Sequence, residues 1–180
     1  MTSQRLSVKG AIHSWRLVAE RADKAFSNLA EDQLLKEVVP GKNRLIYLWG
    51  HLTAIHDPMF PILGLGPRLH PELDVIFIAN PDKAETQILS ARELKEYWDD
   101  VNGKLLSQFA SLSANEWLQR RHVTSEEDYA KDPTQNRLAV LLSRPNHISY
   151  HLGQVMLALK SLAGIKQDVG CTPTLSPTLS

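Results

Sequence analysis

The chain carries the sequence NHISYHLGQ at residues 146–154, within a long segment whose apolar residues follow a helical period. His147 and His151 are four residues apart, which is about one helical turn, so both point the same way from one helix. A third histidine, His51, lies far upstream in the tripeptide GHL at residues 50–52. If His51 reaches the pair from a neighbouring helix, three imidazoles form the open site that is typical of catalytic metals.

Helical periodicity also marks three earlier segments of the chain. From Val8 to Leu29, apolar residues recur at alternating steps of four and three, which predicts one amphipathic helix. The second segment, residues 43–63, repeats the pattern and places His51 at the edge of its apolar stripe. Pro58 and Pro61 predict that this second helix kinks or ends early.

The third helix is expected to begin at Ser90, because Glu93 three residues later completes a capping box. A second candidate box at residues 113–116 predicts one additional short helix. The polar region 120–132 predicts a loop.

The last helix is expected to begin at Asp132-Pro133, an N-cap followed by proline, and to end before Gly164. Pro145 cannot donate the usual backbone hydrogen bond, so it predicts a kink just before His147. Two shorter helices that meet at this proline are the alternative.

The connection between the second and third helices, residues 64–82, is long and contains three prolines. Its apolar run at residues 75–79 predicts a short strand or an extended segment that covers the end of the bundle. A connection of this length is often a lid over a site, and an elaborated crossover loop is the alternative. Because strands are scarce, the sequence predicts an all-α four-helix bundle over residues 1–163, followed by a tail at 164–180.

Composition indicates a soluble, ordinary globular protein. Hydrophobic residues make up 43% of the chain and charged residues 22%. Twenty basic side chains balance twenty acidic ones, so the chain has no net positive charge that would attract nucleic acid or an anionic membrane. A single cysteine, no signal-like N-terminus and no apolar run of about 20 residues predict a cytoplasmic location without membrane insertion.

Gln154 shares the helical face of His147 and His151, so its amide is expected to contact a ligand or a bound water. His56 is five residues from His51 and is expected to point away from it. His13, His70 and His122 are interpreted as ordinary core-edge or loop histidines.

These residues resemble the DinB-like superfamily, which also includes the YfiT-like metal-dependent hydrolases. The resemblance covers residues 5–163, including the order of the four helices. It is carried by Gly50-His51-Leu52 in the second helix and by His147, Tyr150, His151, Gly153 and Gln154 in the last. Pro145 and the connection at 64–82 depart from the usual pattern of the family.

The resemblance implies a four-helix bundle, often a homodimer, in which His51, His147 and His151 bind one divalent metal ion. Zinc or nickel is the first expectation, with iron or manganese as alternatives. Tyr150 and Gln154 are expected to lie near the ligands or the substrate. The sequence does not identify the catalytic residues.

Three functions follow from this site. The first is a thiol S-transferase that binds a low-molecular-weight thiol as its thiolate and directs it at a small-molecule electrophile. The second is a metal-dependent hydrolase, which needs a nearby acid or base; the nearest carboxylate upstream, Asp57, should face elsewhere. The third is a non-catalytic, stress-related bundle. Ferritin-like chemistry is excluded because paired Glu-x-x-His motifs are missing from the sequence.

Overall fold

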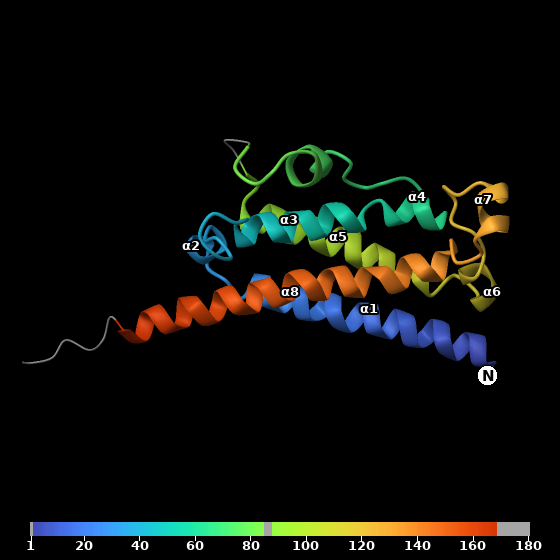
Figure 1. Ribbon diagram of the computed structural model, residues 1–180, viewed down its shortest axis with the longest axis horizontal. Helices are drawn as coiled ribbons and strands as arrows, with labels where there is room; N and C mark the ends of the chain where they lie inside the picture. Colours follow the sequence, from blue (N-terminus) through green and yellow to red (C-terminus); the bar gives the residue numbers. More distant parts are fainter. Residues whose placement is uncertain (1, 85–87, 169–180) are drawn as a thin grey trace, which may run out of the picture.

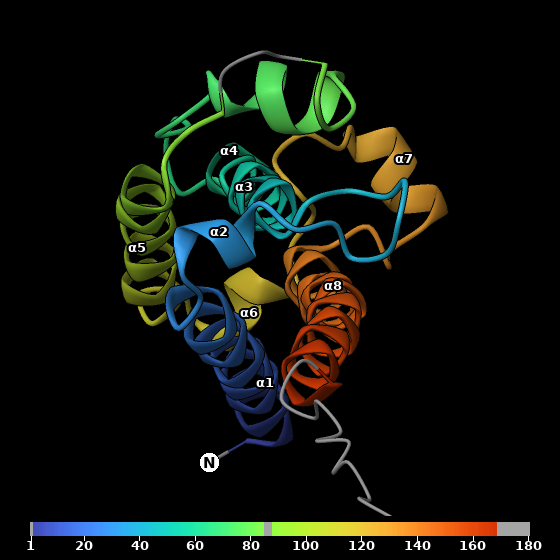
Figure 2. The ribbon, with the colours of Figure 1, turned by 90° about the vertical axis from the view of Figure 1, so that its left-hand side faces the viewer.

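The computed structural model describes residues 2–84 and 88–168, and within these ranges it is helical and has no β-strand. The four longest helices are α1 (Ser3–Ser27), α3 (Leu45–His56), α5 (Ala91–Phe109) and α8 (Arg137–Asp168). Contacts join α1 to α8 and to α5, and join α3 to α5 and to α8, so the four helices surround one core (Figure 2). The predicted all-α class is confirmed.

Among the residues that the structure describes, five shorter helical elements cover the ends and one side of these helices (Figure 1). In chain order they are α2 (Glu31–Leu34), α4 (Met59–Leu63), η1 (Val75–Ala79), α6 (Ala114–Trp117) and α7 (Glu126–Lys131). Within the described ranges, no helix has the length and apolar character that crossing a membrane requires.

Aromatic side chains fill the core between the long helices. The ring of Trp15 in α1 meets the ring of Phe109 in α5 edge-on at 5.1 Å, and Phe26 stacks on Trp49 of α3 at 5.4 Å. All four rings are almost completely buried. Burial of one large apolar side chain contributes about 1.5–3 kcal/mol, so the contact between Phe26 and Trp49 holds α3, and with it His51, against α1.

The connection between α3 and α5 differs from the prediction. Residues 75–79 form η1, one π-helical turn, rather than a strand or an extended segment. Within the described ranges there is no sheet edge with which a strand could pair, so the segment satisfies its backbone locally. The turn packs on α3 with Phe77 fully buried, while Val75 and Ile78 stay exposed. Figure 2 shows η1 lying over the outer side of α3.

The proline and capping signals agree with several helix boundaries. Helix α3 ends at His56 and α4 follows after Pro58, as the second segment predicted. The side chain of Ser90 accepts from the backbone of Glu93 at the start of α5. A second capping box, formed by Ser113 and Glu116, starts α6.

Two boundaries near the last helix were predicted wrongly. The region 120–132 contains the short helix α7, which Ser125 caps by accepting from the backbone of Asp128. Helix α8 begins at Arg137 rather than at Pro133, because Asn136 Oδ1 accepts from the backbone N–H of Ala139 and so caps the helix.

The far end of α8 also differs from the prediction. The helix passes through Gly164 and ends at Asp168, since one glycine costs a helix only about 1 kcal/mol. It is also continuous through Pro145, so the alternative of two shorter helices is wrong. The rest of the predicted tail, residues 169–180, lies outside the described residues.

Candidate metal centre

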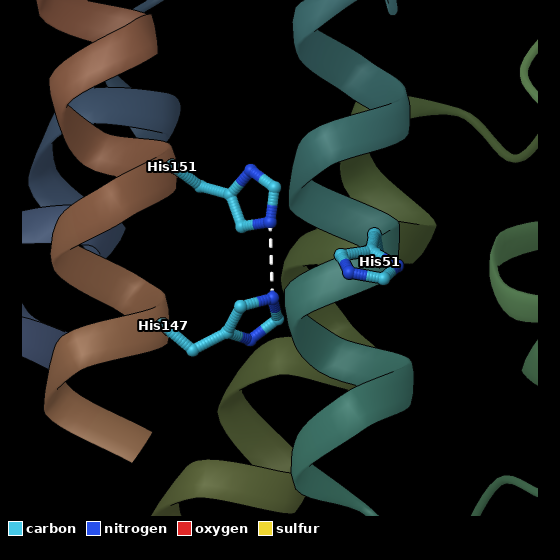
Figure 3. A group of neighbouring side chains, drawn as sticks. All are labelled: His51, His147 and His151. Carbon is cyan, nitrogen blue, oxygen red and sulfur yellow. Dashed lines mark hydrogen bonds between the residues drawn. The ribbon is translucent and has the colours of Figure 1, made fainter. Parts of the chain in front are cut away.

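His51 on α3 and His147 and His151 on α8 form one group, and Figure 3 shows the two rings of α8 pointing toward α3. The ring of His51 is 5.3 Å from the ring of His147 and 5.2 Å from that of His151, centre to centre. One nitrogen from each ring falls within 4.8 Å of the other two. The structure therefore brings together the three histidines that the sequence singled out.

Two of the three rings are held by oxygen acceptors on the side away from the group. Nδ1 of His51 donates to the carbonyl oxygen of Phe77 at 2.8 Å, and Nδ1 of His151 donates to Oε1 of Gln154 at 2.9 Å. A carbonyl oxygen can only accept, so both Nδ1 atoms carry a proton, and in the neutral form of each ring Nε2 keeps a lone pair. This arrangement orients a histidine for binding a metal through Nε2.

The spacing of the ligand atoms fits a small divalent ion. The Nε2 atoms of His147 and His151 face each other at 3.0 Å. Two nitrogens bound tetrahedrally to one zinc ion at about 2.0–2.1 Å lie about 3.4 Å apart. The separations in the group, up to 4.8 Å, bracket this value, so side-chain adjustments of about 1 Å would complete the site. The donor set of three imidazoles suits zinc, nickel, copper or iron.

Burial keeps the rings of His147 and His151 neutral, which metal binding requires. Burial, followed by the neighbouring His151, His51 and Arg144, lowers the pKa of His147 to about 4. Burial also lowers the pKa of His151, against the hydrogen bond to Gln154, which raises it. Both rings are therefore free bases at neutral pH even before an ion binds.

The glycine of the GHL tripeptide has a packing role. A Cβ added at Gly50 would lie 2.2 Å from the ring of Phe77, far inside van der Waals contact. Glycine therefore lets η1 approach α3 closely enough for the Phe77 carbonyl to reach His51. The hydroxyl of Tyr47 holds the same segment by donating to the carbonyl oxygen of Asn80 at 2.7 Å.

Tyr150 and Gln154 lie beside the centre in different ways. Gln154 contacts His151 directly, as its position on the helix predicted. Tyr150 is largely exposed, and its ring lies 5.0 Å from the ring of His151. Both line an open cavity of about 450 Å³ that reaches His151; its walls are Val38, Val39, Lys42, Asn43, Leu48, Tyr150, His151 and Gln154. The cavity gives a small molecule access to the histidines.

Gly153 has no close neighbour in the structure. A Cβ there would meet no atom within 4 Å, so no neighbouring helix requires glycine at this position.

His56 and Asp57 face away from the centre, as expected. His56 is fully buried, donates from Nδ1 to Asn102 at 2.7 Å and has its pKa lowered to about 3 by burial. The carboxylate of Asp57 is also buried and binds the side chain of Arg68. Neither residue belongs to the group of three histidines.

Two residues that contribute to the centre were missed in the sequence. Phe77 acts through its backbone carbonyl, for which side-chain patterns give no signal. Arg144 lies three residues before His147 on the same face of α8, and its charge contributes to lowering the pKa of His147. Its helical spacing could have identified it.

Comparison with known protein families agrees with this geometry. The DinB superfamily matches residues 14–155, which include all three histidines, Tyr150 and Gln154. The chain belongs to the DinB superfamily. Comparison with curated proteins found no match. The DinB assignment that the histidine motif suggested is therefore confirmed for most of the chain.

Proposed function

We propose that this DinB protein binds one divalent metal ion, zinc or nickel first, through Nε2 of His51, His147 and His151. We also propose that it is a thiol S-transferase built on the four-helix bundle of α1, α3, α5 and α8. The observation that carries the proposal is the convergence of three imidazoles, two of them oriented by oxygen acceptors on Nδ1. Three protein ligands leave a coordination position open for a small molecule.

The composition of the centre favours thiol transfer over hydrolysis. When bound, a divalent metal supplies Lewis acidity and deprotonates a coordinated thiol. Within the described residues, no aspartate or glutamate joins the three histidines, so the general base that hydrolysis uses is missing there. A thiolate needs no such base at the moment of attack.

In the proposed reaction the thiol loses its proton to solvent before attack. Its sulfur then forms a bond to an electrophilic carbon, and the bond from that carbon to the leaving group breaks with its electron pair. His51, His147 and His151 hold the reacting centre, and Gln154 and Phe77 keep two of the rings aligned. The cavity beside Tyr150 and His151 is the proposed entrance for the electrophile.

Metal content tests the first half of the proposal. Protein purified without chelator should contain about one divalent ion per chain, and His151→Ala should lose it. His13→Ala is the matched control, because His13 lies on the exposed surface of α1 outside the group and should keep the ion. Equal metal content in His151→Ala and the wild type would disprove the site.

Activity separates transfer from hydrolysis. A panel of low-molecular-weight thiols with an electrophilic aromatic acceptor should give product only with metal-loaded protein and only with thiol present. Turnover of simple esters or amides without thiol would favour the hydrolase instead. A metal-loaded protein that is inactive in both assays, and is only stabilised by its ion, would fit the non-catalytic bundle.

A homodimer and a cytoplasmic location are also part of the proposal. Apolar side chains on α8 support the dimer, since Leu142, Met156 and Leu157 are all exposed. Light scattering on the purified chain should give twice the mass of one chain. A monomer at micromolar concentration would rule this dimer out.

A further inference from the structure

A second cavity, of about 300 Å³, lies on the other side of the centre along α8. Ala139, Val140, Ser143 and Arg144 line it from α8, and Arg121 lines it from the loop before α7. Arg144 is about one helical turn from His147 and about 10 Å along the helix from His151. This cavity and the one at Tyr150 therefore lie on either side of the histidines.

Arg144 lacks the ion pairs that hold two other partly buried arginines, Arg44 and Arg68. Arg44 forms an ion pair with Asp82 at 2.6 Å, and Arg68 forms ion pairs with Asp57 and Asp74. Arg144 has no ion pair or hydrogen bond to any described residue, and its Nε is buried without a partner. Burial accordingly lowers the pKa of its guanidinium.

An unpaired, partly buried guanidinium is costly unless an anion reaches it. The side chain of Arg121, on the other wall, donates only to neutral acceptors. These are Thr124 Oγ1 at 3.1 Å and Gln135 Oε1 at 2.6 Å. The pKa of Asp132 is lowered, first by the hydrogen bond from the Thr134 side chain and to a smaller extent by the charge of Arg121. Asp132 nevertheless forms no ion pair with Arg121. The cavity therefore has two cationic walls and no carboxylate of its own.

The charge expected at the three histidines also favours an anionic ligand. Imidazole ligands carry no charge when they bind a metal, so three of them would leave the full charge of a divalent ion uncompensated, and the nearby Arg144 adds another positive charge. A ligand with two anionic groups, a thiolate at the histidines and a second anion at Arg144, would compensate both. A planar carboxylate matches the paired donors of a guanidinium.

From this arrangement we infer that the cavity between Arg121 and Arg144 binds the carboxylate of the small molecule whose thiol lies at the three histidines. The thiol half of this inference rests on the proposed function, whereas the carboxylate half rests on the two arginines alone. It assigns the substrate to the class of carboxylate-bearing thiols. Arg144 is a binding residue that selects and orients this substrate.

The first test uses metal-free protein, so it is independent of the proposed function. Succinate, titrated by calorimetry or by chemical shift changes, should bind the wild type, whereas neutral succinamide should not. Arg144→Gln should weaken succinate binding about tenfold or more, the change expected for loss of one charge-assisted hydrogen bond. Arg92→Gln, whose side chain is 86% exposed, is the matched control and should bind like the wild type.

The second test places a thiol at the centre. In cobalt-substituted protein, the thiolate-to-metal absorption band reports binding of 3-mercaptopropionate, its longer homologues and the matching mercapto-alcohols. The wild type should prefer the carboxylate thiols about tenfold. Arg144→Gln should lose this preference while its affinity for the alcohols stays the same.

The two tests separate the possible failures. If cobalt does not bind, the proposed function fails, and the succinate titration still decides the carboxylate site. Equal succinate binding by the wild type and Arg144→Gln, or tighter binding of inorganic phosphate than of succinate, would overturn the inference. Arg144→Gln should also unfold at the wild-type temperature or above, because it removes an unpaired charge; a clear loss of stability would mean that Arg144 is a structural residue.

Discussion

Single residues decide how well the three histidines are prepared for a metal. Spacing predicts that His147 and His151 face the same way, and it predicts that Gln154 joins them, because helical positions i, i+4 and i+7 share a face. The oxygen that orients His51 could not be predicted, since it is the backbone carbonyl of Phe77, 26 residues away in the chain. Its position depends on the packing of the connection rather than on any side-chain pattern.

Replacing Gln154 should weaken metal binding without removing a ligand. Gln154→Leu deletes the acceptor for Nδ1 of His151, which then loses its fixed orientation, and metal affinity should fall about 10- to 100-fold. Gln154→Glu keeps an acceptor at the same place and should retain or increase the affinity. Competition with a coloured chelator measures both. If Leu and Glu have the same effect, the hydrogen bond has no role in metal binding.

His56 should make the stability of the metal-free protein sensitive to acid. Its pKa is lowered by burial to about 3 in the folded state, against about 6.5 in the unfolded chain. Between these pH values His56 is protonated in the unfolded chain but not in the folded protein. The free energy of unfolding therefore falls as the pH drops from about 6 to about 4. The contribution of one such group is about 1 kcal/mol per pH unit.

Urea unfolding at several pH values, with chelator present, measures this contribution. His56→Gln removes the titrating ring but can still donate to Asn102, so its stability should fall less steeply with acid than that of the wild type. His13→Gln, on the exposed surface, should keep the wild-type slope. Parallel slopes for His56→Gln and the wild type would contradict the prediction.

At the level of secondary structure, helix boundaries followed capping chemistry wherever the cap lay in the sequence. Ser90 and Ser113 each start a helix where their partners predicted it. Asp132 was misread because its side chain accepts from Thr134 within a turn, while Asn136 caps α8 instead. The π-helical turn at 75–79 could not be distinguished from a strand, because a short apolar run fits both.

The contact between Gly50 and Phe77 should couple the connection to the metal centre. Gly50→Ala places a Cβ against a buried aromatic ring, which should cost about 1–3 kcal/mol and displace η1. Because the displaced segment carries the carbonyl that orients His51, metal affinity should fall as well. Thermal unfolding and chelator competition measure the two effects.

Gly10→Ala is the matched control for this change. Gly10 also lies within a helix, but a Cβ there meets no atom within 4 Å, so alanine should leave metal binding unchanged and stabilise α1 by up to about 1 kcal/mol. If both alanine variants behave alike, close packing at Gly50 does not support the centre.

On the scale of the whole molecule, the group of three histidines lies between two helices that otherwise share few contacts. Helix α8 packs mainly on α1, whereas α3 packs mainly on α5 and η1. His51 lies on α3, which packs with α5, and His147 and His151 lie on α8, which packs with α1. An ion bound to all three histidines would therefore connect these two helix pairs. The periodic segments predict four helices, but periodicity alone does not say which of them are neighbours.

Metal binding should therefore stabilise the entire fold rather than one element. An ion that binds only the folded state at about 100 times its dissociation constant adds about 2.7 kcal/mol to the free energy of unfolding. For a chain of this size each kcal/mol raises Tm by about 2–4 °C, so zinc should raise Tm by about 5–10 °C and chelator should reverse the shift. His147→Ala and His51→Ala should each abolish the shift, because they remove ligands from opposite sides of the interface. If His147→Ala loses the shift but His51→Ala retains it, the ion binds the pair on α8 alone and does not link the helix pairs.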